Sequence, residues 1–269
     1  MPESNYEFWI KSEGRGFFGC PSIDPNIDVT KDCHHRPDLA CAIALDQAKR
    51  GNFTLIPSIL DLYRTTGRQI IDSMIQGIVA YAGPASCFDR IVEVVKSAPE
   101  LQPVLAFCGI MAVRGELSYV PIFLEKYRAN QAYSDAAYMG DYIDDILGGN
   151  LAPVDPDEFS DQVLDRYNQL LKTTSNERML CFRGRLYSVP LLGEHLLEAV
   201  RRPYFQSSWR RSFEAATGID CSPWYVNGIL QPLAATAILE EFLDSPEIKK
   251  YKPGIRYFFG HVIPDRVSR

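Results

Sequence analysis

The sequence predicts an all-α protein, an α-solenoid in which antiparallel helical hairpins stack between irregular N- and C-terminal caps. Three observations lead to this prediction. A short motif recurs along the chain, and apolar residues follow it at helical spacing. In addition, 46% of the 269 residues are hydrophobic and 23% are charged, which is enough apolar material for a large core.

The recurring motif reads Arg-Gly-x-(Phe/Leu)-x-x-(Ile/Val)-Pro and occurs within residues 48–64, 112–128 and 181–197. Self-similarity of this kind is the usual sign of a repeat architecture. The first two copies also share an alanine before the motif and a leucine, a tyrosine and an arginine after it. The motif residues are Arg50, Gly51, Phe53, Ile56 and Pro57, then Arg114, Gly115, Leu117, Val120 and Pro121, then Arg183, Gly184, Leu186, Val189 and Pro190.

Each part of the motif has a physical reason to stand between two helices. A glycine just past a helix end adopts the left-handed conformation without the steric cost of a Cβ. An arginine before it faces the negative end of the helix dipole. A proline in the first turn of the next helix removes an N–H that has no partner within the helix. The motif therefore predicts a helix, a tight turn and a second helix.

The repeat unit is about 32 residues long, because Gly83 lies 32 residues after Gly51 and 32 residues before Gly115. One pair of helices of this length cannot bury its apolar face alone and must stack on neighbouring pairs. The same helical spacing predicts a last helix over residues 224–244. Its expected apolar face consists of Leu230, Leu233, Ala234, Ala237 and Ile238.

We expect residues 1–269 to form a single domain. Residues 37–244 would carry the repeats, and the non-repeating residues 1–36 and 245–269 would cap the two ends of the stack. Helices are expected over residues 38–50, 55–65, 68–82, 86–97, 101–113, 118–129, 133–147, 157–173, 176–182, 188–201, 204–216 and 224–244.

The pattern Gly-x-x-x-x-(Ile/Val)-Pro-x-(Ile/Leu), followed by a second helix, resembles the HEAT-like repeats first noted in phycobilisome lyases. The resemblance covers roughly residues 38–244. It implies the fold but no single function, since such repeats serve scaffolds, lyases and unusual DNA glycosylases. The third copy departs from the pattern, because Gly193 stands where the first copy has Leu60.

The chain is also similar to bacterial immunity proteins that neutralise polymorphic toxins, including contact-dependent inhibition toxins. This resemblance rests on the chain's moderate size, its acidity, its helical repeats and the closing segment 257–261, which reads YFFGH. It implies a cognate toxin that is bound tightly at an acidic surface.

The net charge of −6 narrows the choice of partner. A general nucleic-acid binder needs a basic surface that neutralises phosphates, so we expect a basic protein partner and no nucleic acid. No stretch reaches the roughly 18 apolar residues of a membrane span, and residues 1–19 lack the apolar run of a signal peptide. Seven scattered cysteines do not suggest a disulfide framework, so we expect a cytoplasmic protein without membrane contact.

Residues that could perform catalysis or bind a metal do not form a recognisable motif. Glu194 and His195 lie on an expected helix and are more typical of a helix surface than of a catalytic dyad. Cys33, His34 and His35, with Cys20 and Cys41 nearby in sequence, are candidates for a zinc site. They lack the short paired spacings that zinc prefers, so a cap turn is the favoured interpretation. We expect no enzyme activity, no catalytic residue, no metal and no cofactor.

The segment 129–165 contains nine acidic residues and no lysine or arginine. Asp141, Asp144 and Asp145 share one helix face by their spacing. The acids could form an ordinary solvated face, or a docking surface where complementary charge speeds association with a basic partner. Tyrosine is enriched at interface hot spots and occurs beside these acids. The predicted partner-binding residues are Tyr133, Asp135, Tyr138, Asp141, Asp144, Asp145, Asp157, Glu158 and Asp161.

These features predict a protein-binding protein, specifically an immunity protein or inhibitor that covers the active or target-binding surface of a bacterial toxin. A toxin nuclease domain would be a suitable basic partner. The alternative is a HEAT-like enzyme or nucleic-acid-binding module of the glycosylase or lyase kind, or a general scaffold. Clustering of Arg64, Arg128, Arg183 and Arg210 around one groove would favour the enzyme or nucleic-acid module.

Overall fold

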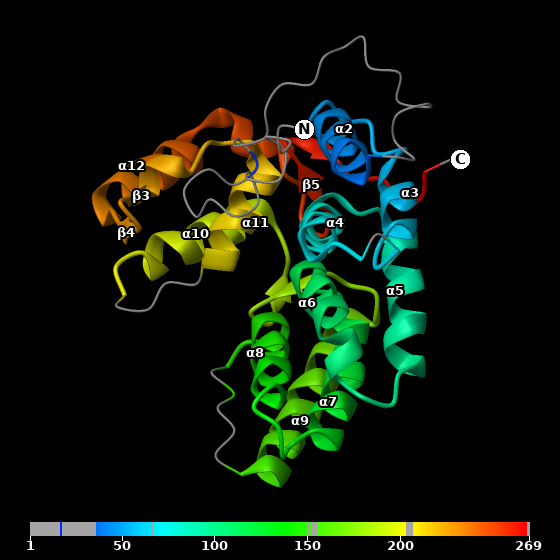
Figure 1. Cartoon of the computed structure of the whole chain (residues 1–269). Coiled ribbons are helices and arrows are strands. Elements are labelled where there is room, and N and C mark those ends of the chain that lie inside the picture. The colour runs from blue at the N-terminus through cyan, green and yellow to red at the C-terminus, as the bar shows by residue number, and fades with distance from the viewer. Residues whose placement is uncertain are drawn as a thin grey trace. The chain divides into compact units, whose positions relative to one another are not determined.

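The computed structural model describes residues 17, 36–65, 67–149, 151, 155–202 and 207–267. Over these residues it contains eleven α-helices and three two-stranded hairpins (Figure 1), which confirms the predicted all-α class at the level of mostly helical content. The chain forms two compact units. We call Met1–Cys87 together with Val189–Arg269 the terminal unit, and Phe88–Ser188 the central unit. The expectation of a single domain stays a prediction, and the expected cap over residues 1–36 lies almost wholly outside the described residues.

The central unit is a group of packed helices with one small hairpin. α7 packs on α8, and α8 also contacts α6, α9 and strand β1. Phe123, Ile143 and Phe159 are fully buried between them and mark the core. The elements are α5 (Ala85–Ser97), which begins in the terminal unit, η3 (Gln102–Val104), α6 (Leu105–Arg114), η4 (Leu117–Tyr119), α7 (Val120–Ala129), α8 (Ala136–Leu147), α9 (Pro156–Thr174), β1 (Cys181–Phe182) and β2 (Arg185–Leu186).

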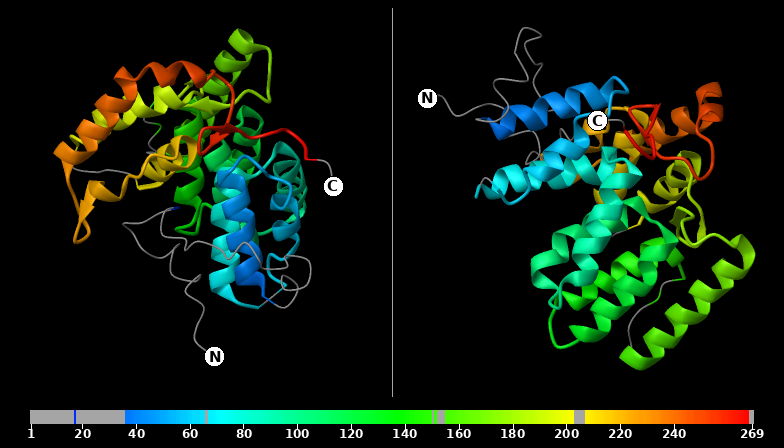
Figure 2. Two further views of the ribbon diagram at one scale, coloured as in Figure 1. Left: turned by 90° about the horizontal axis from the view of Figure 1, so that it is seen from above. Right: turned by 90° about the vertical axis from the view of Figure 1, so that its right-hand side faces the viewer.

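The terminal unit joins helices from the two ends of the described chain. α4 packs on α2 and α3 but also on α11, and strand β5 contacts both α4 and α11 (Figures 1 and 2). In a solenoid each pair of helices contacts only its neighbours in sequence, so the predicted stack of hairpins is not confirmed. The elements are α2 (Pro37–Lys49), α3 (Ile56–Asp61), α4 (Gln69–Ala82), α10 (Val189–Ala199), α11 (Ser207–Thr217), η5 (Ser222–Trp224), β3 (Tyr225–Val226), β4 (Ile229–Leu230), α12 (Pro232–Asp244), η6 (Pro246–Lys250), β5 (Tyr257–Phe258) and β6 (His261–Val262).

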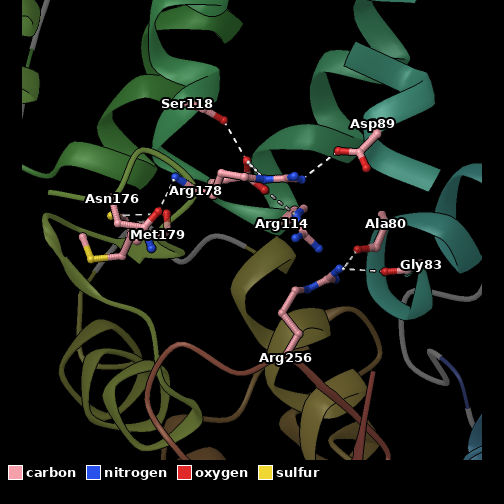
Figure 3. Close-up of polar contacts among 11 residues, drawn as sticks. Ala80, Gly83, Asp89, Arg114, Ser118, Asn176, Arg178, Met179 and Arg256 are labelled. Carbon is pink, nitrogen blue, oxygen red and sulfur yellow. Dashed lines mark hydrogen bonds and ion pairs between the residues drawn. The ribbon is translucent and has the colours of Figure 1, made fainter. Parts of the chain in front are cut away.

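The C-terminal tail packs into the terminal unit. Phe258 is fully buried, and the guanidinium of Arg256 donates hydrogen bonds to the backbone carbonyls of Ala80, Tyr81 and Gly83 at 2.5, 3.2 and 3.2 Å (Figure 3). The last carbonyls of a helix have no partner within it and carry the negative end of its dipole. The arginine therefore caps α4, and the tail joins the N-terminal helices to the C-terminal ones.

The prolines of the three motif copies hold equivalent places. Pro57, Pro121 and Pro190 all lie in the first turn of a helix, namely α3, α7 and α10. Gly51 and Gly115 follow α2 and α6 with φ of 84° and 71°, as the motif predicts for a left-handed glycine past a helix end. The motif therefore marks helix–turn–helix corners in its first two copies.

The helix expected over residues 176–182 is wrong. Its last two residues form strand β1, and Gly184, with φ of 74°, lies in the turn of the β1–β2 hairpin. The helix expected over 224–244 is also wrong in its first part, because the hairpin β3–β4 occupies residues 225–230 and α12 begins only at Pro232. The expected apolar face of this helix is also wrong: Ala235, Leu239 and Phe242 are buried, whereas Leu233 is 88% exposed.

The three hairpins share one turn conformation. The two turn residues are Arg183 and Gly184, Asn227 and Gly228, or Phe259 and Gly260, and their φ values are 51° and 74°, 52° and 76°, and 49° and 77°. Positive φ at both positions defines the type I′ turn, whose twist matches that of paired strands. The chain thus contains the same tight hairpin at three places.

The β1–β2 turn caps the C-terminal end of α8. The backbone N–H groups of Arg183 and Gly184 donate to the carbonyls of Asp145 and Ile146, each at 2.8 Å. Gly148 follows the helix with φ of 66°, and a Cβ there would lie only 2.6 Å from the carbonyl oxygen of Arg183. A hairpin distant in sequence therefore satisfies carbonyls that the helix leaves without partners.

The β5–β6 turn caps α11 in the same way and in the same register. The N–H groups of Phe259 and Gly260 donate to the carbonyls of Ala215 and Ala216 at 2.6 and 2.9 Å. Again a glycine with positive φ, Gly218 at 72°, follows the helix next to the hairpin. Each unit therefore contains one helix end that is held by a type I′ hairpin.

Candidate functional site

The predicted partner-binding residues all lie in the central unit, on α8, in the turn before it and in the first two turns of α9. Tyr133 and Tyr138 are 68% and 50% exposed. Asp141 lies three residues after Tyr138, hence on the same side of α8, and is also exposed. Its pKa is raised, first by partial burial and second by the negative charge of Asp144. All three side chains are therefore open to a partner.

Asp144 and Asp145 differ from Asp141, because both are partly buried at the end of α8. The carboxylate of Asp144 forms an ion pair with Arg183 at 2.5 Å and accepts the N–H of Leu151 at 3.1 Å. The negative charge of Asp144 is thus neutralised within the unit, where it helps to hold the capping hairpin. Sequence reasoning missed this pairing, because Arg183 lies outside the segment 129–165, which contains no lysine or arginine.

The acidic residues of α9 lie at its N-terminal end. Asp155 caps the helix, since its carboxylate accepts the N–H groups of Asp157 and Glu158 at 2.9 and 3.1 Å. Asp157, Glu158 and Asp161 are exposed, and their negative charges favour a helix N-terminus. The remaining predicted residue, Asp135, accepts a hydrogen bond from the side chain of Gln102.

Part of the predicted set therefore remains open to a partner. We call these residues the acidic surface: Tyr133, Tyr138, Asp141, Asp157, Glu158 and Asp161. Within the described ranges, none of its four carboxylates forms an ion pair with a lysine, arginine or histidine. The acidic surface can offer a partner both negative charge, from its four carboxylates, and exposed aromatic rings, from its two tyrosines.

A second polar cluster of the central unit is structural. Glu116 is buried, and its carboxylate pairs with Arg114 at 3.1 Å and with Arg178 at 3.2 Å while it accepts the hydroxyl of Ser118 at 2.8 Å. Arg178 also pairs with the exposed Asp89 at 2.7 Å (Figure 3). The backbone reinforces the link, since residues 117, 118 and 181 donate to the carbonyls of residues 179, 177 and 115. This network fixes the chain between α9 and β1 against the corner between α6 and α7.

The terminal unit buries two ionisable residues of α11. Arg210 and Glu214 lie one helical turn apart and expose 1% and 0% of their surface. The Glu214 carboxylate accepts the N–H of Phe17 at 2.9 Å, and its loss of solvent raises its pKa to about 7 although Arg210 opposes the shift. A general acid or base must reach a substrate, and this group has no exposed surface, so we interpret it as part of the core.

The raised pKa of Glu214 predicts a pH dependence of stability. Between about pH 4.5 and pH 7 the folded chain keeps a proton that the unfolded chain has released, so the free energy of unfolding falls as pH rises through this window. Glu214→Gln should remove this contribution, which is at most about 3 kcal/mol. Denaturant titrations of both proteins from pH 4.5 to 8 measure it.

Glu241→Gln, on the exposed side of α12, is the control for this experiment and should leave the slope of stability against pH unchanged. Equal slopes for the wild-type protein and for Glu214→Gln would show that the buried carboxyl does not titrate in this range.

Cys108, Cys181 and Cys221 are unsuited to nucleophilic chemistry. The reactive species is the thiolate, and burial raises the pKa of Cys108 and of Cys181 to about 12 and raises that of Cys221 further. The described residues include no cluster of three or more histidine, cysteine, aspartate or glutamate side chains suited to a metal. The zinc candidates Cys20, Cys33, His34 and His35 lie outside the described residues, and Cys41 is buried in α2.

The fold and the site define a mostly helical protein with an exposed acidic and tyrosine-bearing surface in its central unit. Among the helices that the structure describes, we find none with both the length and the apolar character of a membrane span. No family model, no curated protein and no solved structure matches the chain.

Proposed function

We propose that the chain is a protein-binding protein that docks a basic partner on the acidic surface. The observation that carries this proposal is that Tyr133 and Tyr138 are exposed in the same unit as four exposed carboxylates, which have no ion-pair partners in the described structure. Charges of one sign speed association with an oppositely charged partner and orient it. Exposed tyrosines supply rigid, partly apolar contact area, which is typical of interface hot spots.

We further propose that the partner is a bacterial toxin, such as a nuclease domain, and that the chain is its immunity protein in the cytoplasm. An inhibitor of this kind acts by covering the toxin's active or target-binding surface and needs no catalytic residue of its own. The net charge of −6 supports a basic partner. Stacking of the helical pairs as a solenoid is part of the same proposal, and the equivalent places of Pro57 and Pro121 support it.

The alternative of a nucleic-acid-binding or glycosylase-like module has less support. It requires free basic groups that can neutralise phosphates. Arg183 is paired with Asp144, and Arg210 is buried. Arg128 is bonded to Ser160 on α9, in the neighbourhood of the acidic residues.

Reversing three charges of the acidic surface, with Asp141→Lys, Asp157→Lys and Asp161→Lys together, is expected to lower the affinity for the partner by about tenfold or more. The loss should lie mainly in the association rate and should shrink at high salt. The partner would be recovered with the tagged full-length chain from its host, purified, and its binding kinetics measured at two salt concentrations.

The matched control changes the net charge equally but in the terminal unit, with Glu194→Lys, Glu240→Lys and Glu241→Lys on the exposed sides of α10 and α12. An equal loss of association rate in both triple variants would indicate an effect of net charge alone. Unchanged kinetics in the first triple variant would refute the acidic surface as the docking site.

A further inference from the structure

The third hairpin, β3–β4, has the same turn as the other two but holds no helix end. Asn227 and Gly228 have φ of 52° and 76°, within a few degrees of the two helix-capping turns. Yet their N–H groups donate to no backbone carbonyl of the described chain, and a Cβ at Gly228 would have open space around it. Two hydrogen-bond donors that are used in the equivalent turns are therefore exposed here.

The side chain before the turn shows the same difference. This position holds an apolar residue in all three hairpins. It is 8% exposed at Phe182 and 0% exposed at Phe258, the hairpins that cap α8 and α11, but 54% exposed at Val226. Its cross-strand partner Ile229 is also exposed, and so is Leu233 in the first turn of α12. The β3–β4 hairpin thus combines free donors with an uncovered apolar residue that its counterparts bury.

We propose that the β3–β4 turn binds the C-terminal end of an α-helix of another protein, and that a glycine follows this helix. The last carbonyls of a helix lack partners and carry the negative end of its dipole, which complements two exposed N–H donors. The glycine is required because the equivalent Gly148 would place a Cβ only 2.6 Å from the backbone of the capping turn. The apolar side of the helix would cover Val226 and Ile229.

Among the helices that the structure describes, a second copy of this chain offers no suitable occupant, because their ends are covered. In the described chain, the helices followed by a left-handed glycine are α2, α6, α8 and α11. A Cβ at each of these glycines would approach another segment of the same unit to 3.0 Å or less, namely His261, Cys181, Arg183 and Phe259. A second copy would have to open its fold to offer one of these ends.

This inference is independent of the proposed function, because the β3–β4 hairpin belongs to the terminal unit and the acidic surface to the central unit. It gives the chain a second binding site. This site would bind a helix end through backbone hydrogen bonds, whereas the acidic surface would bind a partner through charged side chains. Failure of the charge-reversal experiment would leave it untouched, and its own failure would leave the acidic surface untouched.

The test uses the full chain labelled with ¹⁵N and a stapled alanine–leucine helix of about 16 residues that ends in Leu-Gly-amide, long enough to be helical when stapled. We expect saturable downfield shifts of the Asn227 and Gly228 amide protons, with a dissociation constant below about 1 mM. The matched peptide ends in Leu-Ala-amide, and its Cβ should weaken binding by about tenfold or more.

Val226→Ser should lower the affinity for the peptide that ends in glycine by about fivefold or more. Val262→Ser, at a position on β6 that is 56% exposed, should leave this affinity unchanged. If Val226→Ser lowers the unfolding temperature, Ile229→Ser replaces it. Absence of both amide shifts up to about 1 mM, or equal affinity for the two peptides, would overturn the proposal. Self-association of the chain that Val226→Ser abolishes would also overturn it, in favour of a second copy.

Discussion

Replacing Gly184 by alanine is expected to lower the free energy of unfolding by about 3 kcal/mol or more. A residue with a Cβ at φ of 74° carries a conformational cost of about 1 kcal/mol. The new Cβ would in addition overlap the carbonyl oxygen of Leu147 at the end of α8. Relief of that overlap requires the hairpin to move away, which breaks its two hydrogen bonds to the helix, each about 1 kcal/mol.

Gly228→Ala is the matched control, because it occupies the same turn position at φ of 76° with open space behind it. It should cost only the conformational term, about 1 kcal/mol. Chemical denaturation followed by circular dichroism compares the two variants. Equal losses would mean that the β1–β2 turn does not press against α8, which would remove the basis of the helix-capping hairpin.

Replacing Glu116 by alanine is expected to cost about 3 to 5 kcal/mol, the loss typical of removing one partner from a buried ion pair. The side chain of Arg114 is only 9% exposed and would keep its charge without the carboxylate. The loop from α9 to β1, which Arg178 links to Glu116, should then become more mobile. Denaturant titration gives the stability loss, and amide hydrogen exchange of residues 176–181 reports the loop.

Asp89→Ala separates the buried part of this network from its exposed part. It removes only the partner of Arg178 that is itself half exposed, and exposed ion pairs contribute about 0 to 1 kcal/mol. If Asp89→Ala lost as much free energy of unfolding as Glu116→Ala, the exposed ion pair would contribute as much stability as the buried one, contrary to the prediction. Retained protection of residues 176–181 in Glu116→Ala would show that the backbone hydrogen bonds alone hold the loop.

Most helices could be predicted from local sequence. The corners at Gly51 and Gly115 and the prolines in the following helices depend on the allowed φ of single residues and on the missing N–H of proline. These constraints act within a few residues of the chain. The sequence is therefore sufficient to place these helix boundaries, and the apolar spacing identifies most of the helices.

The third copy of the motif shows where local reasoning fails. The sequence around Gly184 satisfies the same pattern, yet the left-handed glycine closes a type I′ hairpin instead of ending a helix. A positive φ is compatible with either structure. Here the end of α8 supplies hydrogen-bond acceptors that select the hairpin, and those acceptors are distant in sequence. At Asn227-Gly228, in contrast, the sequence itself contains the Asn-Gly pair that is typical of a type I′ turn.

The candidate site divides in the same way. The sequence by itself determined that acids and tyrosines accumulate over residues 130–165, because composition and helical spacing are local properties. Only the tertiary structure decided which of them are available: Arg183 neutralises Asp144, whereas Asp141 stays exposed. It also decided that the C-terminal tail completes the core of the terminal unit. Ion pairs and helix caps between distant segments depend on the path of the whole chain, which no local pattern specifies.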